Sequence, residues 1–319
     1  MTGYLIGCDG SRYELPVLLE WKTQYACGTP CDSFEVLCPW GPGLDGRLSD
    51  AVRFEGYEAG KRVFTGVVDE YEHRWSEAGG RLFLSGRGMG ALLLDNEALP
   101  ADYQTATLDD ILRRHVFPYG VAVAERENLP SVPGFSVESG SSEWQVLYNF
   151  VKYHGGIEPR FDREGRLVLR GYGGGVKLVV DDKTAITDVV YREKRYGVLS
   201  EVIVLDRARQ TSQRSVEQSR LDRGYRARRV VCTPGRSTYR EMRYSGEFQL
   251  KESGKERLEL ELTLPTAFAA WPGDTVEIKR TRPALSGAWR VREAECGASA
   301  AGVYTRLVLG EAESPNQLR

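Results

Sequence analysis

The stretch Lys61-Arg62-Val63-Phe64-Thr65-Gly66-Val67-Val68, together with Arg81-Leu82-Phe83-Leu84-Ser85, decides the fold class of this 319-residue chain. Both runs alternate apolar and polar residues with a period of two, and the glycines of Ala78-Gly79-Gly80 lie between them. This pattern is typical of antiparallel strands with one solvated face. Similar short runs and turns recur from Pro16 onward, so we predict an all-β domain over residues 1–87.

Residues 88–187 are predicted to form an inserted α+β unit of two helices and a small sheet. The first helix is expected at 107–116, where Thr107 is a suitable N-cap, acids follow in the first turn and bases lie in the last. The second is expected at 143–154, where apolar residues recur with helical spacing. A hairpin is predicted to turn at residues 162–165.

Alternating apolar runs return from Asp188 and predict a second β domain over residues 188–319. The runs expected as one antiparallel set lie at residues 188–191, 200–205, 256–264, 274–278, 288–291 and 304–309. Within this domain a polar excursion at residues 207–229 has no apolar periodicity. The predicted fold class is therefore mainly β, with two antiparallel β-barrels flanking a small two-helix α+β domain.

The composition of the chain excludes several classes of protein. Apolar residues make up 41% and charged residues 28% of the chain, which is close to the average of folded globular proteins. No apolar stretch approaches the roughly 18 residues of a membrane span, and no basic region precedes an apolar one at the N-terminus, so we expect synthesis in a cytoplasm. The formal net charge of −2 gives no whole-chain argument for nucleic-acid binding.

Residues suited to catalysis are scarce in this sequence. The only histidines are His73, His115 and His154. Catalytic triads and His-ligated metal sites depend on such residues, and no nucleophile-elbow motif accompanies them. The carboxylate pairs Asp109-Asp110 and Asp181-Asp182 are explained by a helix start and a turn. We therefore expect a protein that is not an enzyme, with no catalytic, cofactor-binding or metal-binding residue and no cofactor.

Two further motifs resemble ligand sites but have structural explanations. Residues 86–91, Gly-Arg-Gly-Met-Gly-Ala, match G-x-G-x-x-[GA], yet the apolar run ends at Leu94 without a βαβ unit, so we expect a glycine-rich crossing from a strand into the insert. Cys27, Cys31 and Cys38 lack a CxxC pair and a nearby histidine, so we expect small buried thiols rather than a zinc site. The sequence leaves their role open.

Positive charge is concentrated in one part of the chain. Residues 191–243 carry fourteen Lys and Arg against six Asp and Glu, a local net charge of +8 that leaves −10 for the remainder. Interleaved Arg and Tyr are typical of protein interfaces, and a nucleic-acid surface has the same composition. We expect a solvated face or partner interface that includes Arg226, Arg228 and Arg229, and loops such as 207–229 are expected to gain their structure from partners.

Three groups of motifs, taken in order, resemble a known family. The motifs are Phe64-Thr65-Gly66-Val67-Val68-Asp69 with residues 82–88, then residues 107–120 and 135–169, then Trp271-Pro272-Gly273-Asp274-Thr275-Val276 with residues 287–291. Their order and spacing are similar to those of the baseplate hub proteins of contractile phage tails and related injection machines, the late control or XkdQ/YqbQ-like family. The motifs cover most of the chain, although the loop 27–38 and the basic excursion have no place in the family pattern.

This resemblance implies a structural hub without an active site. Each subunit would contribute two tail-tube-like barrels, so that a homotrimer forms a pseudo-sixfold ring between the hexameric tail tube above and the trimeric spike below. Other baseplate or wedge proteins and the tape measure protein are further expected partners, and neither a membrane nor a specific nucleic acid is expected. The implied location is the tail baseplate of a virion assembled in the bacterial host cytoplasm. A phage, a tailocin and a domesticated injection system all stay open as the parent machine.

Two other classes of function stay open at this point. A tail-associated cell-wall hydrolase would lose activity when its histidines are mutated. A nucleic-acid-binding β-barrel protein would bind single strands in a salt-dependent way, and neutralising Arg226, Arg228 and Arg229 would abolish that binding.

Overall fold

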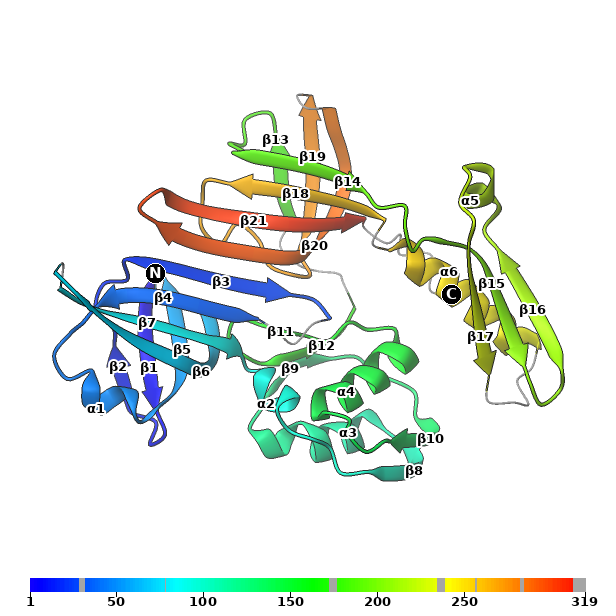
Figure 1. The fold of residues 1–319 in the computed structure, drawn as a ribbon, viewed down its shortest axis with the longest axis horizontal. Helices are drawn as coiled ribbons and strands as arrows, with labels where there is room; N and C mark the ends of the chain where they lie inside the picture. The colour runs from blue at the N-terminus through cyan, green and yellow to red at the C-terminus, as the bar shows by residue number, and fades with distance from the viewer. Residues whose placement is uncertain are drawn as a thin grey trace.

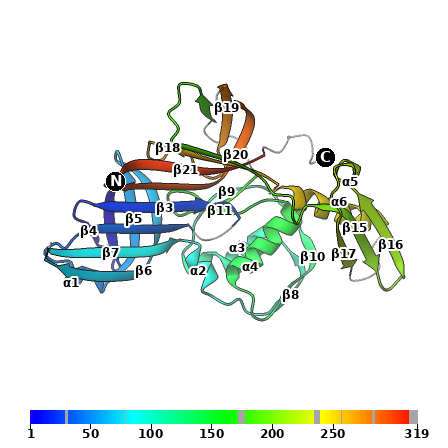
Figure 2. The same ribbon diagram turned by 45° about the horizontal axis from the view of Figure 1, so that its top comes forward.

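The computed structural model describes residues 1–28, 32–77, 79–171, 177–233, 239–255, 257–281 and 284–311. Strands make up 52% and helices 17% of the structure, so the protein is mainly β, which confirms the predicted fold class. In Figure 1 the strands from the two ends of the chain lie side by side, the helices of the insert lie below them, and a smaller unit stands apart on the right. The tilted view in Figure 2 keeps the same separation.

The N-terminal part is an antiparallel β structure built on the alternation seen in the sequence. Its elements are β1 (Thr2–Gly7), β2 (Arg12–Glu14), β3 (Glu20–Ala26), β4 (Ser33–Pro39), α1 (Asp45–Leu48), β5 (Ala51–Glu58), β6 (Lys61–Ser76) and β7 (Gly79–Gly88). Every second residue of β7 from Leu82 onward is buried. The rings of Phe34 and Phe54 stack with their centroids 4.3 Å apart, and Phe64 packs beside them at the centre of this part.

The C-terminal strands continue the same sheet. They are β13 (Lys177–Asp181), β14 (Asp188–Glu193), β18 (Leu258–Leu264), β19 (Thr275–Thr281), β20 (Ala284–Ser299) and β21 (Gly302–Glu311). The strand order is β14-β18-β21-β20-β3-β4-β7-β6-β5-β1-β2, with β19 also on β20 and β13 on β19. The two halves join where β20 pairs antiparallel with β3, and one hydrophobic core runs under both. Trp21 on β3 stacks on Phe268 at 5.2 Å across this join.

The insert has its own hydrophobic core. Its elements are α2 (Ala91–Leu94), β8 (Ala101–Ala106), α3 (Leu108–His115), η1 (Phe117–Tyr119), β9 (Val123–Arg126), β10 (Val132–Val137), α4 (Glu143–Tyr148), η2 (Asn149–His154), β11 (Arg160–Phe161) and β12 (Leu167–Leu169). Both predicted helices are present. Thr107 and Asp110 form a reciprocal capping box at α3, and α4 continues as the π-helix η2. The predicted hairpin turns at Asp162, whose carbonyl accepts from the amide of Gly165.

Residues 199–254, which we call the basic unit, differ from the prediction. They form β15 (Leu199–Asp206), β16 (Thr211–Val216), α5 (Gln218–Asp222), β17 (Ala227–Thr233) and α6 (Tyr239–Gly254). The run 200–205, expected in the second antiparallel set, is instead the centre of a separate sheet ordered β16-β15-β17. The excursion 207–229, expected as loops awaiting partners, is largely structured because β15 and α6 bury a small core of their own around Val202, Val204 and Leu250.

One turn of the insert, at residues 162–165, contacts both halves of the large sheet. The Arg163 carbonyl accepts a hydrogen bond of 3.1 Å from the Thr65 hydroxyl on β6. The Arg163 guanidinium lies 3.7 Å from the centre of the Trp271 ring, which belongs to the C-terminal half. The hydrogen bond and this cation–π contact together join three parts of the chain that lie far apart in the sequence.

Candidate interaction surfaces

The three arginines predicted as a partner interface lie on or just before β17, but they do not form one cluster. Arg226 donates to the carbonyls of Leu221 and Tyr225 at the end of α5, at 2.7 and 2.8 Å. Arg228 donates to Glu201 at 2.8 Å, and Arg229 donates to Gln249 of α6 at 2.8 Å. Because successive side chains of a strand point to opposite faces, Arg228 and Arg229 lie on opposite faces of the sheet.

β17 is the exposed strand of the basic unit. The helix α6 packs mainly on β15 and β16, and β17 pairs only with β15 among the described residues. Val230 is 53% exposed and Cys232 is also exposed. A strand with a free edge and exposed apolar side chains is a natural site of contact with another chain.

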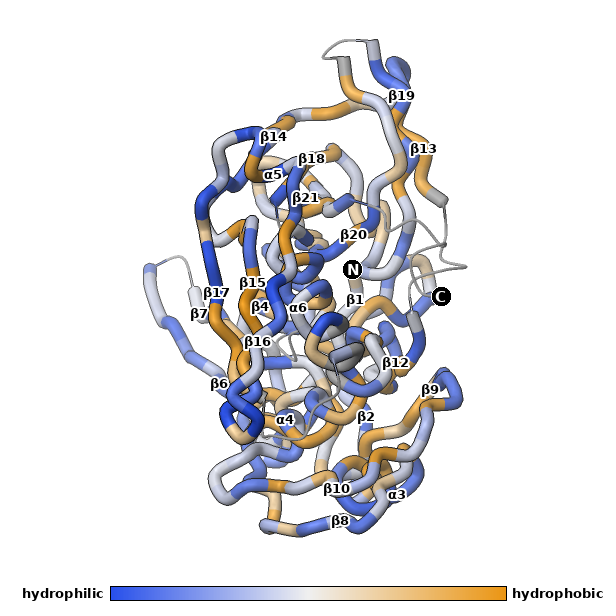
Figure 3. Tube along the Cα trace, turned by 90° about the vertical axis from the view of Figure 1, so that its right-hand side faces the viewer, coloured by the Kyte–Doolittle hydropathy of each residue, from blue (hydrophilic) through white to orange (hydrophobic). Residues whose placement is uncertain are grey.

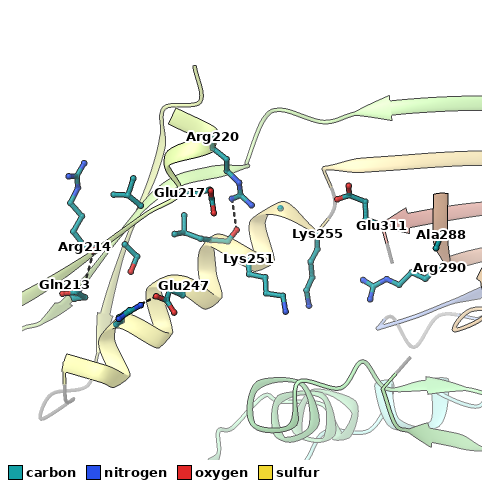
Figure 4. Close-up of a pocket in the computed structure, with 15 residues that line it drawn as sticks. Gln213, Arg214, Glu217, Arg220, Glu247, Lys251, Lys255, Ala288, Arg290 and Glu311 are labelled. Atoms are coloured by element: carbon teal, nitrogen blue, oxygen red, sulfur yellow. Dashed lines mark hydrogen bonds and ion pairs between the residues drawn. The ribbon is translucent and has the colours of Figure 1, made fainter. Parts of the chain in front are cut away.

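A cleft of about 940 Å³ separates the basic unit from the large sheet (Figure 4). Its charged lining residues are Arg214, Glu217, Arg220, Arg243, Glu247, Lys251, Lys255, Arg290 and Glu311. Figure 4 shows Lys251 extending from α6 and Lys255 from the residue after it, with Arg290 and Glu311 on the opposite side of the gap. Six bases against three acids make this cleft positively charged, which suits an acidic protein segment better than an apolar small molecule.

Several of these bases already have structural roles, Arg214 with Glu201 and Lys255 with Glu252 among them. Arg220 donates to the carbonyls of Leu199 and Leu250, and burial lowers its pKa below the usual range. Arg243 is paired with Glu247 at 2.7 Å within α6. The sequence pointed to the charge of this region, but it gave no sign of α6, so Lys251 and Lys255 were missed.

The distal part of β6, residues 69–76, is exposed along its whole length; we call it the β6 arm. It pairs with β7 on one side, whereas β5 pairs only with residues 61–67. Its aromatic residues Tyr71 and Trp75 are 47% and 68% exposed. The alternation in the sequence predicted the strand to residue 68, and the exposed continuation was missed because its charged residues carry no burial signal.

The three histidines lie in different environments and do not form a common site. His115 is 1% exposed, and its Nδ1 lies 2.5 Å from a Glu143 oxygen. His73 on the β6 arm packs edge-on against Trp40 at 3.9 Å, and His154 packs against Phe135. Among the described residues, the histidine that contacts a carboxylate is therefore buried, where it cannot reach a polymeric substrate.

The cysteine candidates cannot share a metal ion. Cys38 on β4 is buried in the large core, which raises the pKa of its thiol to about 11. Cys27 follows the end of β3. Because β3 and β4 run antiparallel with Glu20 opposite Leu37, Cys38 lies beside the start of β3. At the rise per residue of an extended strand, this separates Cys38 from Cys27 by about 25 Å. Cys31 lies outside the described residues. No group of His, Cys, Asp and Glu in the described part of the chain could hold a metal ion.

The glycine-rich motif serves close backbone packing. A side chain at Gly86 would lie 2.0 Å from the Val67 carbonyl oxygen and 2.6 Å from the Phe34 ring. The motif leads into α2, which has four residues and is too short to provide a helix N-terminus for phosphate. These contacts agree with a crossing from β7 into the insert.

The two carboxylate pairs also have structural roles. Asp110 completes the capping box of α3, and Asp109 is ion-paired with Arg126. Asp181 accepts from the amides of residues 183 and 184 in a turn, while Asp182 bonds Thr281. Over the described residues, no helix combines the length and the apolar character that crossing a membrane requires.

Comparison with known proteins identifies the fold. No protein-family model matches the sequence, and no curated protein matches it. A tail protein from Neisseria meningitidis is 20% identical, with a TM-score of 0.79 over 97% of this chain and 96% of that chain. The 43 kDa tail protein of prophage MuSo2 from Shewanella oneidensis is 14% identical, with a TM-score of 0.77 over 97% of both chains.

A secretion-system component has a related structure. The E. coli c3393 protein, a component of the type VI secretion system with structural similarity to T4 bacteriophage tail proteins gp27 and gp5, is 13% identical to this chain. The TM-score is 0.59, and the match covers 93% of this chain and 74% of that chain. The protein described here therefore has the fold of phage tail proteins over nearly its whole length.

Proposed function

We propose that this chain is a structural subunit of a contractile phage tail or a related injection particle, and more specifically its baseplate hub. Three copies would form a pseudo-sixfold ring that joins the hexameric tail tube to the trimeric spike. The tube protein, the spike protein, other baseplate or wedge proteins and the tape measure protein are its proposed partners. Its proposed location is the tail baseplate, after assembly in the host cytoplasm.

The observation that carries this proposal is the match to whole tail proteins from end to end. Such a match covers both β parts, the insert between them and the basic unit, rather than one widespread domain. The architecture supports the proposal, because a tube-like ring needs β domains whose sheets are joined edge to edge. Here β20 of the C-terminal half pairs directly with β3 of the N-terminal half. We propose the domains 1–87, 88–187 and 188–319, the last containing the basic unit.

The described residues do not favour the two rival functions. A hydrolase needs an accessible base, whereas His115 is held in the insert core between Glu143 and Tyr103. A nucleic-acid surface gathers its arginines on one face, where they contact successive phosphates. Here Arg228 and Arg229 lie on opposite faces of β17, so the three arginines do not form one basic surface.

Imaging of a tail particle tests the proposed function. A copy of the chain carrying a small fused label should appear at the junction between tube and spike, in three equivalent positions per particle. A label along the sheath, at the fibres or in no particle would contradict the hub assignment. Cell-wall hydrolysis by the purified chain, lost in a His73→Ala variant, would support the hydrolase instead.

A further inference from the structure

The β6 arm exposes a strand edge that no other strand covers in the described residues. The register between β6 and β7 shifts between Val68 and Glu70, so that Asp69 forms a bulge. Arg87 holds this bulge with two hydrogen bonds to Asp69, at 2.7 and 2.9 Å, and also bonds Asp95. A bulge bends a strand, and β5 pairs with β6 only as far as Val67, so the arm leaves β5 and presents the backbone groups of that edge outward.

The second edge that no described strand covers belongs to β17. This strand has seven residues, and its free edge faces away from β15. Figure 3 shows the tube of β17 passing from hydrophilic to hydrophobic along its length. The hydrophilic end carries Arg226, Arg228 and Arg229, and the hydrophobic end carries Val230 and Cys232.

The two edges are complementary in charge and similar in length. The eight residues of the β6 arm carry Asp69, Glu70 and Glu72 in their first half and Trp75 near their end. A parallel alignment sets the acidic half of the arm against the basic half of β17, and Trp75 against Cys232. An antiparallel alignment would instead oppose Arg74 to the arginines, so charge favours the parallel one.

Within one chain these edges cannot meet, because they lie at opposite ends of the long axis of the molecule (Figure 1). Two different patches that fit each other generate head-to-tail contacts, and such contacts close into a ring when the rotation between copies permits. We propose that the β6 arm of one copy adds as a parallel strand to β17 of the next copy. This contact rests on the proposed trimeric hub and names the surfaces that would hold it together.

Cross-linking between engineered and native thiols tests the contact. In the proposed alignment Trp75 lies opposite Cys232, which is native and exposed. In a Cys8→Ser background, Ser76→Cys therefore places a second thiol one residue further along the arm. A short bismaleimide reagent and an equal mixture of isotopically light and heavy chains should give peptides that link residues 76 and 232 of different copies. Val52→Cys, on an exposed position of β5, is the matched control and should give no such link.

The result separates this inference from the proposed function. A trimeric chain that yields no link between residues 76 and 232 would refute the strand contact and leave the hub intact. A chain that stays monomeric by mass would contradict the hub itself. Linkage of Cys232 to a different tail component in a particle, with none to residue 76, would also overturn the proposed contact.

A charge exchange gives an independent test. Glu72→Arg opposes like charges at the position that faces Arg229, so the dissociation constant of the trimer should rise at least about tenfold. Adding Arg229→Glu should restore most of the affinity, because the pair is then reversed rather than broken. Glu20→Arg, an exposed acid outside the arm, is the control for net charge. An equal effect of Glu72→Arg and Glu20→Arg would overturn the proposal, as would failure of the second change to rescue.

Discussion

At the scale of single residues, Asp32 links stability to pH. The side chain is 6% exposed, and burial raises the pKa of its carboxyl to about 7. The unfolded chain ionises this group near pH 4, so between about pH 4 and 7 the folded protein binds a proton that the unfolded protein has released. Stability therefore falls as pH rises through this range.

Replacing Asp32 by Asn should remove this dependence. Asn keeps an oxygen that can accept the 3.0 Å hydrogen bond from the Ala26 amide but carries no charge. Between pH 5 and pH 8 the wild-type free energy of unfolding should fall by about 2–3 kcal/mol more than that of the variant. Urea denaturation at the two pH values measures the difference, and parallel pH profiles would refute the assignment.

Glu143 holds together a buried polar network in the insert. It accepts from Tyr119 at 2.7 Å and lies 2.5 Å from His115. Glu143→Ala would leave both partners without their acceptor, at an expected cost of about 3 kcal/mol in unfolding free energy. Glu138→Ala, at an exposed position, should change stability by less than about 0.5 kcal/mol. Equal denaturation midpoints for the two variants would contradict this role.

The capping residues of α3 and the buried network around Glu143 differ in how far the sequence could predict them. Thr107 and Asp110 are three residues apart, so the capping box follows from local spacing. His115 and Glu143 are separated by 28 residues and meet only because α3 and α4 pack together. The sequence therefore predicted the helix cap but not the buried network.

At the scale of elements, the close approach of β6 and β7 requires glycine. A Cβ at Gly86 would lie 2.0 Å from the Val67 carbonyl oxygen, so the paired backbone would have to move. We expect Gly86→Ala to destabilise the protein by about 2–4 kcal/mol. Gly46→Ala is the control, because nothing lies within 4 Å of its added methyl group. Thermal unfolding of both variants measures the difference, and a Gly86→Ala variant as stable as its control would contradict the packing.

Strands with a local alternation were predictable, and elements defined by their tertiary partners were not. The core strands β4 and β7 bury every second residue over most of their length. In contrast, α6 is mostly polar and buries Met242 and Leu250 with Gly246 between them. A side chain at Gly246 would lie 2.4 Å from the Ser215 hydroxyl, so the helix needs glycine to approach β16. The need for glycine at position 246 follows only from the contact between α6 and β16, which the sequence alone does not show.

At the scale of the whole molecule, charge is separated along the chain. The formal net charge of −2 conceals +8 over residues 191–243 and −10 over the remainder. In the structure the basic unit stands apart from the large sheet, at the opposite end from the acidic β6 arm (Figure 1). A molecule polarised in this way favours head-to-tail contacts between copies over symmetric pairs, because like charges would face each other in a twofold dimer.

The mass of the chain in solution shows whether three copies assemble. Sedimentation equilibrium or native mass spectrometry over a range of concentrations should reveal a species of three times the 35.7 kDa chain mass. We expect this trimer to be the largest discrete species and to dissociate to single chains on dilution. A chain that stays monomeric at every concentration, or that assembles into twofold dimers, would contradict it.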